Sequence, residues 1–412
     1  MNILLIYHFF HPDKVVSAQI FSDLAKDLSA AGHKVTVFTS NHYFNGTLIS
    51  PDEEPFPAVN VEICRFSRPS FRQNGNIGRL LNSFILQRKW VKAFEKCHAE
   101  FDAVILGTDP QFGYMMLPRM RRIAPKCLLI HWALDLYPEA IEARWPCLKP
   151  LISLFRFLPR RAYSKADVLA HLGDCMKKRL EAYHSPAKLA LLTPWALVEP
   201  DTLPPIDTKQ RCAITGADAS INVQTPKIAL LYSGTIGHAH NIHPFIQLAR
   251  ECKKHNLSVH LCFSGGGNCA DLQKKWIMQD DTNISFGQYV PSNELVARLA
   301  SADFHLVSVR TGWEGVVAPS KFFAALAVGR PVIYSGPENS CVAKWIREYD
   351  LGFILNDNTV SDLETLLNLP EDQLAARMAQ LRQNAWNTYH NHFSRKIVFS
   401  RFQAILQEGT TK

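Results

Sequence analysis

The segments ILLIYHF (residues 3–9) and VTVFTS (residues 35–40) lie on either side of a helical stretch, and this order decides the fold class. Each is a short, mainly apolar run, which is typical of a strand buried on both faces of a parallel sheet. Residues 17–31 show helical periodicity, and Gly32 ends that helix. The chain is therefore predicted to begin with a strand–helix–strand unit.

The same alternation continues in two blocks. Further buried strands are predicted in the first block at 103–108, 127–132 and 166–172, and in the second at 228–234, 259–267, 304–309 and 331–334. Residues 194–226 separate the blocks and carry five prolines without periodicity, as a linker does. Because 412 residues exceed the size of one hydrophobic core, two α/β domains are favoured. One large doubly wound sheet explains the mid-chain break less well.

The basic character of the chain is concentrated in its first half. The formal net charge is +8, from 45 Lys/Arg and 37 Asp/Glu. Residues 1–200 contain 25 basic and 18 acidic side chains, whereas residues 201–412 contain 20 and 19. This asymmetry predicts an anionic partner for the first half. No nucleic-acid-binding signature accompanies the charge, so a membrane surface or a phosphorylated acceptor is favoured.

Two basic stretches interleave with aromatic and aliphatic residues. Residues 65–96 contain eight Lys/Arg and one acid, and residues 144–179 contain nine and two. Such stretches can lie on anionic lipid, although a solvated basic face over an ordinary core stripe has the same composition. We expect docking through residues 65–96, with residues 144–161 as a second region.

Cysteine usage and hydropathy favour a cytoplasmic protein that can also lie peripherally on the inner face of the cell membrane. The ten cysteines form no CxxC pair, which disfavours a zinc or redox site and fits a reducing cytosol. No apolar run is long enough to span a bilayer. The start, MNILLIYHFF, lacks the features of a signal peptide and is interpreted as a strand.

Polar residues that follow strands are the candidates for chemistry, because open α/β sheets bind ligands beyond the carboxyl ends of their strands. In the second block, YSGTIGHAHNIH (232–243) places glycines between a strand and a helix, which suits a diphosphate. A plain strand–turn–helix corner is the alternative. Three histidines crowd the segment without a nearby carboxylate or cysteine, so a metal site is disfavoured. The candidate diphosphate-binding residues are Gly234, Thr235, Ile236, Gly237 and His238.

The segment EGVVAPSKFFAALAVGRPVIYSG (314–336) contains a second candidate phosphate site. Lys321 stands beside Pro319 and Ser320 at the expected start of a helix, where its charge adds to that of the helix amides. Glu314 precedes this turn and can also be a solvated loop carboxylate.

Two strand ends of the first block also carry polar side chains. HWALDLYPE (131–139) presents His131 and Asp135, although His131 can also be a satisfied core histidine. The loop FFHPDKVVSAQ (9–19) follows the first strand and can bind an acceptor; a helix cap by Ser17 is the alternative. The candidate residues of this loop are His11, Asp13, Ser17 and Gln19.

Together these segments resemble the GT-B glycosyltransferases, specifically the retaining family 4 enzymes of bacterial surface-polysaccharide assembly. The likeness is carried by LLIYHFFHPDKVVSAQ, HWALDLYPE, YSGTIGHAHN and ADFHLVSVR…EGVVAPSKFFAALAVGRPVI, of which the last is the most specific. The resemblance implies an α/β fold of two Rossmann-like domains facing each other across a cleft. The implied parts are an acceptor domain at 1–195, a linker at 196–226, a nucleotide-sugar domain at 227–390, and a C-terminal helix at 391–412 that returns to the first domain.

The resemblance also implies roles for single residues. His131 matches the family's histidine near the reacting sugar, Gly234 to Gly237 match the pyrophosphate turn, and Lys321 matches the basic residue of the PSK turn. Tyr289 and Val290 fall where the nucleotide base is gripped.

The sequence departs from the family pattern in three places. The second of two family glutamates, which binds the ribose, is replaced by Ala324. Glu314 lies two residues upstream of the place of the first. The pyrophosphate turn carries His238 where the family often has Arg or Lys, and the charge of a histidine varies with pH.

The implied activity is transfer of a sugar from a nucleoside diphosphate sugar to a hydroxyl of a lipid-linked or glycan acceptor, with retention, by a hexosyltransferase-type enzyme (EC 2.4). The expected catalytic residues are His131, Glu314 and Lys321. Cations and amides would stabilise the leaving diphosphate, so no metal or other cofactor is expected. A sugar-nucleotide epimerase and a non-catalytic nucleotide-sugar-binding protein of the same fold are the alternatives. An oxidoreductase is disfavoured because no GxGxxG follows the first strand.

Overall fold

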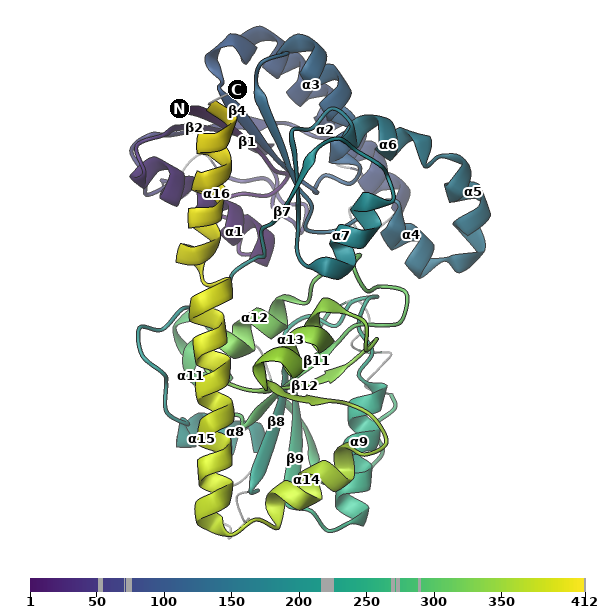
Figure 1. Cartoon of the computed structure of the whole chain (residues 1–412), viewed down its shortest axis with the longest axis vertical. Coiled ribbons are helices and arrows are strands. Elements are labelled where there is room, and N and C mark those ends of the chain that lie inside the picture. Colours follow the sequence, from purple (N-terminus) through teal and green to yellow (C-terminus); the bar gives the residue numbers. More distant parts are fainter. Residues whose placement is uncertain are drawn as a thin grey trace. The chain divides into compact units, whose positions relative to one another are not determined.

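The chain forms two compact units (Figure 1). The computed structural model describes residues 1–50, 55–69, 71, 76–215, 226–267, 271, 275–287 and 290–410. Unit 1 comprises Met1–Leu197, Gly315–Ala318 and Val398–Lys412, and unit 2 comprises Val198–Glu314 and Pro319–Ile397. The division after Leu197 lies two residues beyond the domain end expected from the sequence. The chain re-enters unit 1 twice, briefly at 315–318 and again with its last helix.

Unit 1 is built on a parallel sheet that has seven strands among the described residues, in the order β3-β2-β1-β4-β5-β6-β7. The strands are β1 (Asn2–Ile6), β2 (Lys34–Ser40), β3 (Val61–Phe66), β4 (Ala103–Gly107), β5 (Leu128–Trp132), β6 (Val168–His171) and β7 (Lys188–Leu191). The central strands are buried on both faces, which explains their continuous apolar sequences. Because β1 pairs with both β2 and β4, the strand order reverses there, and such a switch point is where open sheets bind ligands.

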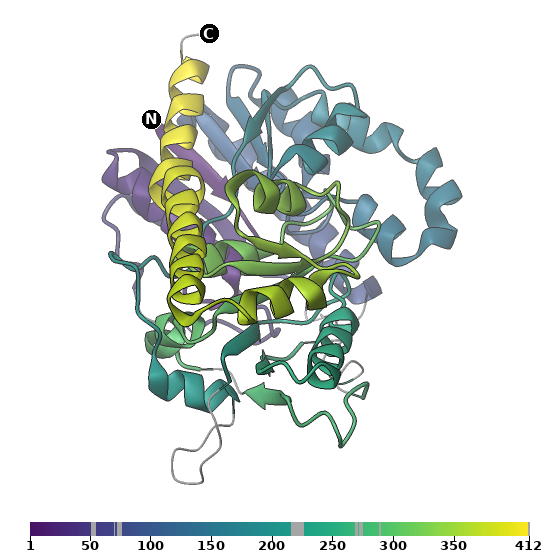
Figure 2. The same ribbon diagram turned by 60° about the horizontal axis from the view of Figure 1, so that its bottom comes forward.

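Helices cover this sheet and one group of them projects from it. The helices of unit 1 are α1 (Val16–Ala30), α2 (Asn76–Cys97), α3 (Leu117–Ile123), α4 (Glu139–Arg144), α5 (Lys149–Leu154), α6 (Phe157–Tyr163), α7 (Asp174–Glu181) and α16 (Arg395–Thr410), with a short 3₁₀ turn, η2 (Gly113–Met116), before α3. The segment α4–α6 extends away from the sheet in both views (Figure 1 and Figure 2). The last helix packs on unit 1 through Phe402, whose ring centroid lies 5.0 Å from that of Trp132 in β5.

Unit 2 repeats the architecture around a parallel sheet that has six strands among the described residues, in the order β10-β9-β8-β11-β12-β13. The strands are β8 (Ile228–Ser233), β9 (Val259–Ser264), β10 (Ile284–Gly287), β11 (Phe304–Ser308), β12 (Val332–Ser335) and β13 (Gly352–Ile354). The helices are α8 (Thr208–Thr215), α9 (His243–Lys254), α11 (Leu295–Ala300), α12 (Ser320–Ala327), α13 (Cys341–Tyr349), α14 (Thr359–Leu367) and α15 (Glu371–Thr388). The switch point of this sheet lies between β8 and β11.

Of the expected linker at 196–226, the described residues from Val198 onward belong to unit 2. Helix α8 buries Ile214 completely in a core cluster with Leu231. Arg211 on the same helix forms an ion pair with Asp303 at 2.8 Å. The prolines that suggested a linker lie on either side of this short helix. A helix of eight residues is too short for its hydrophobic periodicity to be recognised in the sequence.

Candidate functional site

Two neighbouring strands at the switch point of unit 2 end in turns that the sequence singled out. β8 ends at Ser233, directly before Gly234, and β11 ends at Ser308. Helix α12 begins at Ser320 after Pro319, without a side-chain cap on its first amides. The strands are parallel, so the residues that follow them lie at the carboxyl edge of one sheet, beside a helix start with free N–H groups.

The turn after β8 packs on a second glycine-rich turn, which follows β9. The Gly234 amide donates to Ser264 O at 2.8 Å, and the Ile236 amide donates to Gly266 O at 2.7 Å. Gly265 has φ +143°, and a Cβ there would lie 2.3 Å from the Gly234 oxygen. No other residue fits that space, so the two turns hold each other in a fixed geometry.

Lys321 brings a cation to this glycine turn. Its Nζ donates to Thr235 O at 2.8 Å and lies 5.1 Å from the centroid of the Tyr232 ring. A Cβ on Gly234 would come within 3.3 Å of the lysine Cε, so the lysine stem lies along the turn. The ammonium group keeps some accessible surface, yet burial lowers the pKa of Lys321 to about 8. A cation that is short of solvent in this way gains from an anionic ligand.

Arg310, a second cation at this edge, is a residue that the sequence analysis missed. Its amide donates to Ala239 O at 2.8 Å, and its Nε donates to His240 O at 2.7 Å. His240 accepts a hydrogen bond from the Gly237 amide at 3.0 Å, and burial, reinforced by the charges of Lys321 and Arg310, lowers its pKa to about 3. Neutral His240 therefore connects Arg310 to the glycine turn. An arginine directly after a predicted strand was the signal that could have found it.

The other predicted donor-side residues differ in exposure. The exposed ones are Thr235 and His238, the partly exposed ones are Gly237, Val290 and Ser320, and the buried ones are Ile236 and Pro319. Tyr289 lies outside the described residues. Glu314 accepts a hydrogen bond from the Gly312 amide at 2.7 Å, so part of its carboxylate supports its own loop. Ala324, one helical turn after Lys321, is partly exposed on the same helix.

In unit 1, the expectation that His131 stands at the mouth of the sheet is wrong. β5 continues through Trp132, and His131 is 1% exposed. Its Nδ1 is 3.1 Å from Leu106 O, and its ring stacks 5.7 Å from that of Tyr163. Burial lowers its pKa to about 4, so the ring is neutral. His131 is the satisfied core histidine that the sequence also allowed.

The edge of unit 1 instead carries a group of charged side chains around Asp135. Asp109 lies two residues after the end of β4, and its Oδ1 lies 3.0 Å from His8 Nδ1. Arg79 of α2 approaches the other Asp109 oxygen to 3.6 Å. Burial opposes ionisation of Asp109, but His8, Arg79 and Arg68 outweigh it and hold its pKa below the usual value. His8, Arg79 and Asp109 were not among the residues expected from the sequence, although Asp109 follows the predicted strand at 103–108.

Asp135 is partly exposed at this edge, where a ligand can reach it. Burial, reinforced by the negative charge of Asp109 and offset in part by Arg79, raises the pKa of Asp135 to about 6. Its backbone forms an isolated bridge with Val317, and the Leu136 amide donates to Val316 O at 2.9 Å. The short segment Gly315–Ala318 of unit 1 therefore lies against the Asp135 loop.

The loop after β1 lines a cavity of about 910 Å³ in unit 1, with His11, Asp13 and Gln19 among its lining residues. Asp13 is 8% exposed and accepts hydrogen bonds from the Val15 amide (3.1 Å) and the Phe44 amide (2.6 Å), so its carboxylate holds the loop together. Gln19 donates to Lys14 O at 2.6 Å.

Ser17 is partly exposed beside this loop and hydrogen-bonds Tyr7. The alternative in which Ser17 caps the helix is wrong, because the N-cap of α1 is Val15 and no side chain caps it.

The basic stretch at 65–96 turns much of its charge inward. Arg68 is 5% exposed, Arg65 donates to His11 O at 2.5 Å, and Arg79 faces Asp109. Lys89 donates to Ser67 O at 2.6 Å. Within the described part of this stretch, Arg88, Lys92 and Lys96 remain on the surface.

The segment Leu148–Phe157 of the projecting arm behaves differently, because its apolar side chains face solvent. Its exposed large apolar residues are Leu148 (37%), Leu151 (57%), Leu154 (69%), Phe155 (46%) and Phe157 (58%). Residues 144–166 contain six Lys/Arg and no Asp or Glu.

The described residues contain no group of three or more His, Cys, Asp or Glu side chains arranged to hold a metal ion. Nor do they include a helix both long and apolar enough to cross a membrane.

The chain is similar to known glycosyltransferases. Residues 216–387 match the family model described as "Glycosyl transferases group 1". The "Probable glycosyltransferase WbjE" of Pseudomonas aeruginosa is 23% identical over 362 residues, which cover 85% of each chain.

Solved structures share the fold over almost the whole chain. The sucrose-phosphate synthase of Thermosynechococcus elongatus gives a TM-score of 0.69 at 14% identity, covering 99% of this chain and 98% of that one. WaaG, a glycosyltransferase involved in lipopolysaccharide biosynthesis, gives a TM-score of 0.58 at 17% identity, covering 98% of both.

Proposed function

We propose that this chain, a glycosyltransferase of the GT-B fold (EC 2.4), transfers a sugar from a nucleoside diphosphate sugar to an acceptor hydroxyl with retention at the anomeric carbon. The product would be a cell-surface polysaccharide or glycolipid. The observation that carries the proposal is Lys321, a partly desolvated cation hydrogen-bonded onto the glycine turn at the switch point of unit 2.

The reaction breaks the bond between the anomeric carbon and a diphosphate oxygen and forms one to the acceptor oxygen, while the acceptor hydroxyl loses its proton. Negative charge grows on the departing diphosphate. Lys321, Arg310 and the amides of Gly234–Gly237 are the groups of unit 2 that can stabilise this charge. They are held in place before the substrate binds by the paired glycine turns and by His240.

A reaction without a metal ion follows from the same groups. Two side-chain cations and a helix start are present where the diphosphate would lie, so they can supply the charge that a divalent ion supplies elsewhere.

Unit 1 would hold the acceptor. Asp135 is a partly exposed carboxyl at the carboxyl edge of its sheet, and a carboxylate there can accept a hydrogen bond from a sugar hydroxyl. Asp109, Arg79 and His8 fix the surroundings of that carboxyl and would act as positioning residues.

A peripheral position on an anionic membrane forms part of the proposal, with residues 144–161 as its main contact. Exposed Leu and Phe side chains on a short helical arm can enter the headgroup region, while the adjacent Lys and Arg attract anionic lipid. The inward-facing basic residues of 65–96 make that stretch the weaker candidate.

The transfer is tested by incubating the purified protein with a panel of UDP-, GDP- and dTDP-sugars and measuring released nucleoside diphosphate. We expect slow hydrolysis of one donor without acceptor and an axial-to-axial or equatorial-to-equatorial outcome by NMR of the transferred sugar. Inversion would refute retention. Failure of every donor to be hydrolysed or to raise the Tm would refute the donor assignment.

The membrane contact is tested by liposome co-sedimentation. Leu154→Glu with Phe157→Glu should abolish binding to anionic vesicles, whereas Leu48→Glu, at an apolar residue that is 64% exposed elsewhere in unit 1, should not. Binding that is unchanged by the double substitution would refute the arm as the contact.

A further inference from the structure

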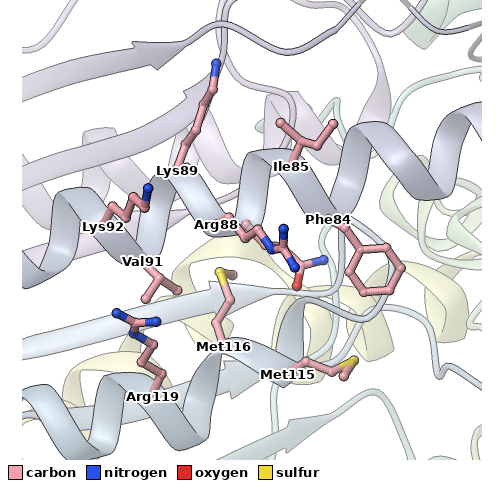
Figure 3. Close-up of a pocket in the computed structure, with 10 residues that line it drawn as sticks. Phe84, Ile85, Arg88, Lys89, Val91, Lys92, Met115, Met116 and Arg119 are labelled. Atoms are coloured by element: carbon pink, nitrogen blue, oxygen red, sulfur yellow. The ribbon is translucent and has the colours of Figure 1, made fainter.

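A groove runs between α2 and the η2–α3 segment of unit 1, with a volume of about 660 Å³. Its apolar lining comes from both sides, with Val91 and Met116 buried and Phe84 and Met115 exposed by 41% and 38%. Figure 3 shows these side chains between the two helices. The opposite face of α2 packs into the core through Trp90.

Helix α2 is therefore apolar on two faces, and the protein covers the second of them only in part. Leu86, Trp90 and Phe94 have no exposed surface. The second face contributes Phe84, Ile85 and Val91 to the groove. An open apolar surface of this kind costs free energy in water and is typical of a binding site.

Four cations line the same groove. Arg88 and Lys92 stand one helical turn apart on α2 and are exposed, and among the described residues no carboxylate lies within ion-pair distance of either. Arg119 reaches across from α3 (Figure 3). It pairs with Glu95 at 3.1 Å. Lys89 is held by Ser67. The groove thus combines an apolar floor with a cationic rim.

An aromatic and hydrogen-bonded path connects this groove to Asp135. The Phe84 ring stacks on Phe112 with centroids 6.4 Å apart, and Phe112 lies 5.6 Å from Tyr137. Gln87, another lining residue, donates to Gln111 O at 2.9 Å, and Gln111 donates to the Tyr137 hydroxyl at 3.0 Å. Tyr137 is two residues from Asp135 in sequence.

The positions of Arg79 and Arg88 along α2 show how far the groove lies from the charged group around Asp109. Arg79, beside Asp109, precedes Arg88 by nine residues, which is about 13 Å of helix. A molecule that extends along α2 from the Arg79 end of the helix would meet Arg88 after about 13 Å.

From this arrangement we propose that the groove binds one amphiphilic anion: a lipid whose phosphate or diphosphate meets Arg88, Lys92 and Arg119, and whose first hydrocarbon units lie on Val91, Met115 and Met116. The proposal deepens the proposed function, because this lipid is the carrier of the acceptor sugar. A concave groove can accept a single hydrocarbon chain. Contact with a bilayer instead requires a projecting protein surface, such as the arm at Leu148–Phe157.

The test is direct binding of farnesyl diphosphate, below its micelle concentration, by isothermal titration calorimetry, with farnesol and inorganic pyrophosphate as separate arms. We expect farnesyl diphosphate to bind more tightly than either, because only it has both parts. Arg88→Glu with Lys92→Glu should weaken it by about 30-fold or more, from the loss of two basic contacts. Met115→Gln, which removes apolar contact without adding charge, should weaken farnesyl diphosphate but leave pyrophosphate unchanged.

Lys96→Glu is the matched control, since Lys96 is an exposed lysine of the same helix outside the groove. It should bind like wild type. Unchanged affinity in the double variant, equal loss in Lys96→Glu, or association with anionic vesicles but not with monomeric farnesyl diphosphate would overturn the groove proposal. Donor hydrolysis without acceptor, measured in parallel, should be unaffected by the double substitution. If that hydrolysis is absent from wild type as well, the proposed function fails while the binding result still decides the groove.

Discussion

Replacement of Lys321 by methionine tests the donor site most directly. The substitution keeps a long apolar stem along Gly234 and removes the ammonium that donates to Thr235 O at 2.8 Å. Because the lost contact is with a leaving diphosphate, the effect should fall on the transition state. Loss of one such preorganised group costs about 2–4 kcal/mol, so kcat/KM for the donor should fall roughly 30- to 900-fold.

The same substitution should not destabilise the fold at neutral pH. Burial lowers the pKa of Lys321 from 10.5 to about 8, so the folded protein holds this proton less tightly than the unfolded chain. The charged lysine therefore costs stability below pH 8, and that cost disappears as the pH rises from 8 to 10.5. The full difference corresponds to roughly 3 kcal/mol, which solvent at the partly exposed ammonium reduces to about 1–2 kcal/mol. Lys321→Met should consequently have a Tm at pH 7 equal to or above that of wild type.

The assay is donor turnover as a function of pH, together with thermal unfolding. For wild type, kcat/KM should decline as the pH rises through about 8, because the free enzyme loses the Lys321 charge. In Lys321→Arg the decline should move to higher pH, since arginine stays protonated. A folded Lys321→Met protein with near-normal kcat/KM, or a pH profile that is identical in Lys321→Arg, would show that this cation does not meet the diphosphate.

Three further results are expected. Gly265→Ala should raise the KM for the donor, because its Cβ would stand 2.3 Å from the Gly234 oxygen, whereas Gly46→Ala, also at positive φ but with no atom within 4 Å, should leave KM unchanged; equal effects would contradict the paired-turn geometry. Asp135→Asn should abolish most transfer. Because the folded-state pKa of Asp135 is about 6, wild type loses up to about 3 kcal/mol of stability as this carboxyl ionises, so the stability of the variant relative to wild type should increase as the pH rises from 4 to 6. A Tm difference that is constant between pH 4 and 7.5 would refute this. Donor turnover should persist in EDTA, and a loss that manganese or magnesium restores would place a metal ion at the diphosphate.

The donor side could be predicted because its chemistry is local in sequence. Gly234 directly follows an apolar strand, and Lys321 stands at a helix start after a proline, so two short motifs identify two parts of one site. The contact between them required only that both strands belong to one parallel sheet. Arg310 also follows a strand of this sheet. It was missed because an arginine after a strand is common and belongs to no motif.

The acceptor side was harder because its groups come from distant parts of the chain. His8, Arg79 and Asp109 meet through the strand order around β1 and β4, and no local pattern encodes that meeting. The predicted strand at 127–132 ends where β5 ends, at Trp132, so His131 is a strand residue whose ring lies inside the sheet layer, and Asp135 takes the accessible position. The apolar run predicts the strand but not which way the side chain of His131 points.

Charge composition predicted an anionic partner for the first half without locating it. Within residues 65–96, Arg68 is buried in unit 1, and the partly exposed Arg79 offsets the charge of Asp109. Arg88 and Lys92 on the same helix face outward over an apolar groove. In our proposal this basic helix serves two purposes: its first turn would organise the acceptor carboxylates and its middle would offer cations to a ligand. Net charge counts both purposes alike, and only the burial of each guanidinium and ammonium separates the cations that hold the fold from those that can bind a phosphate.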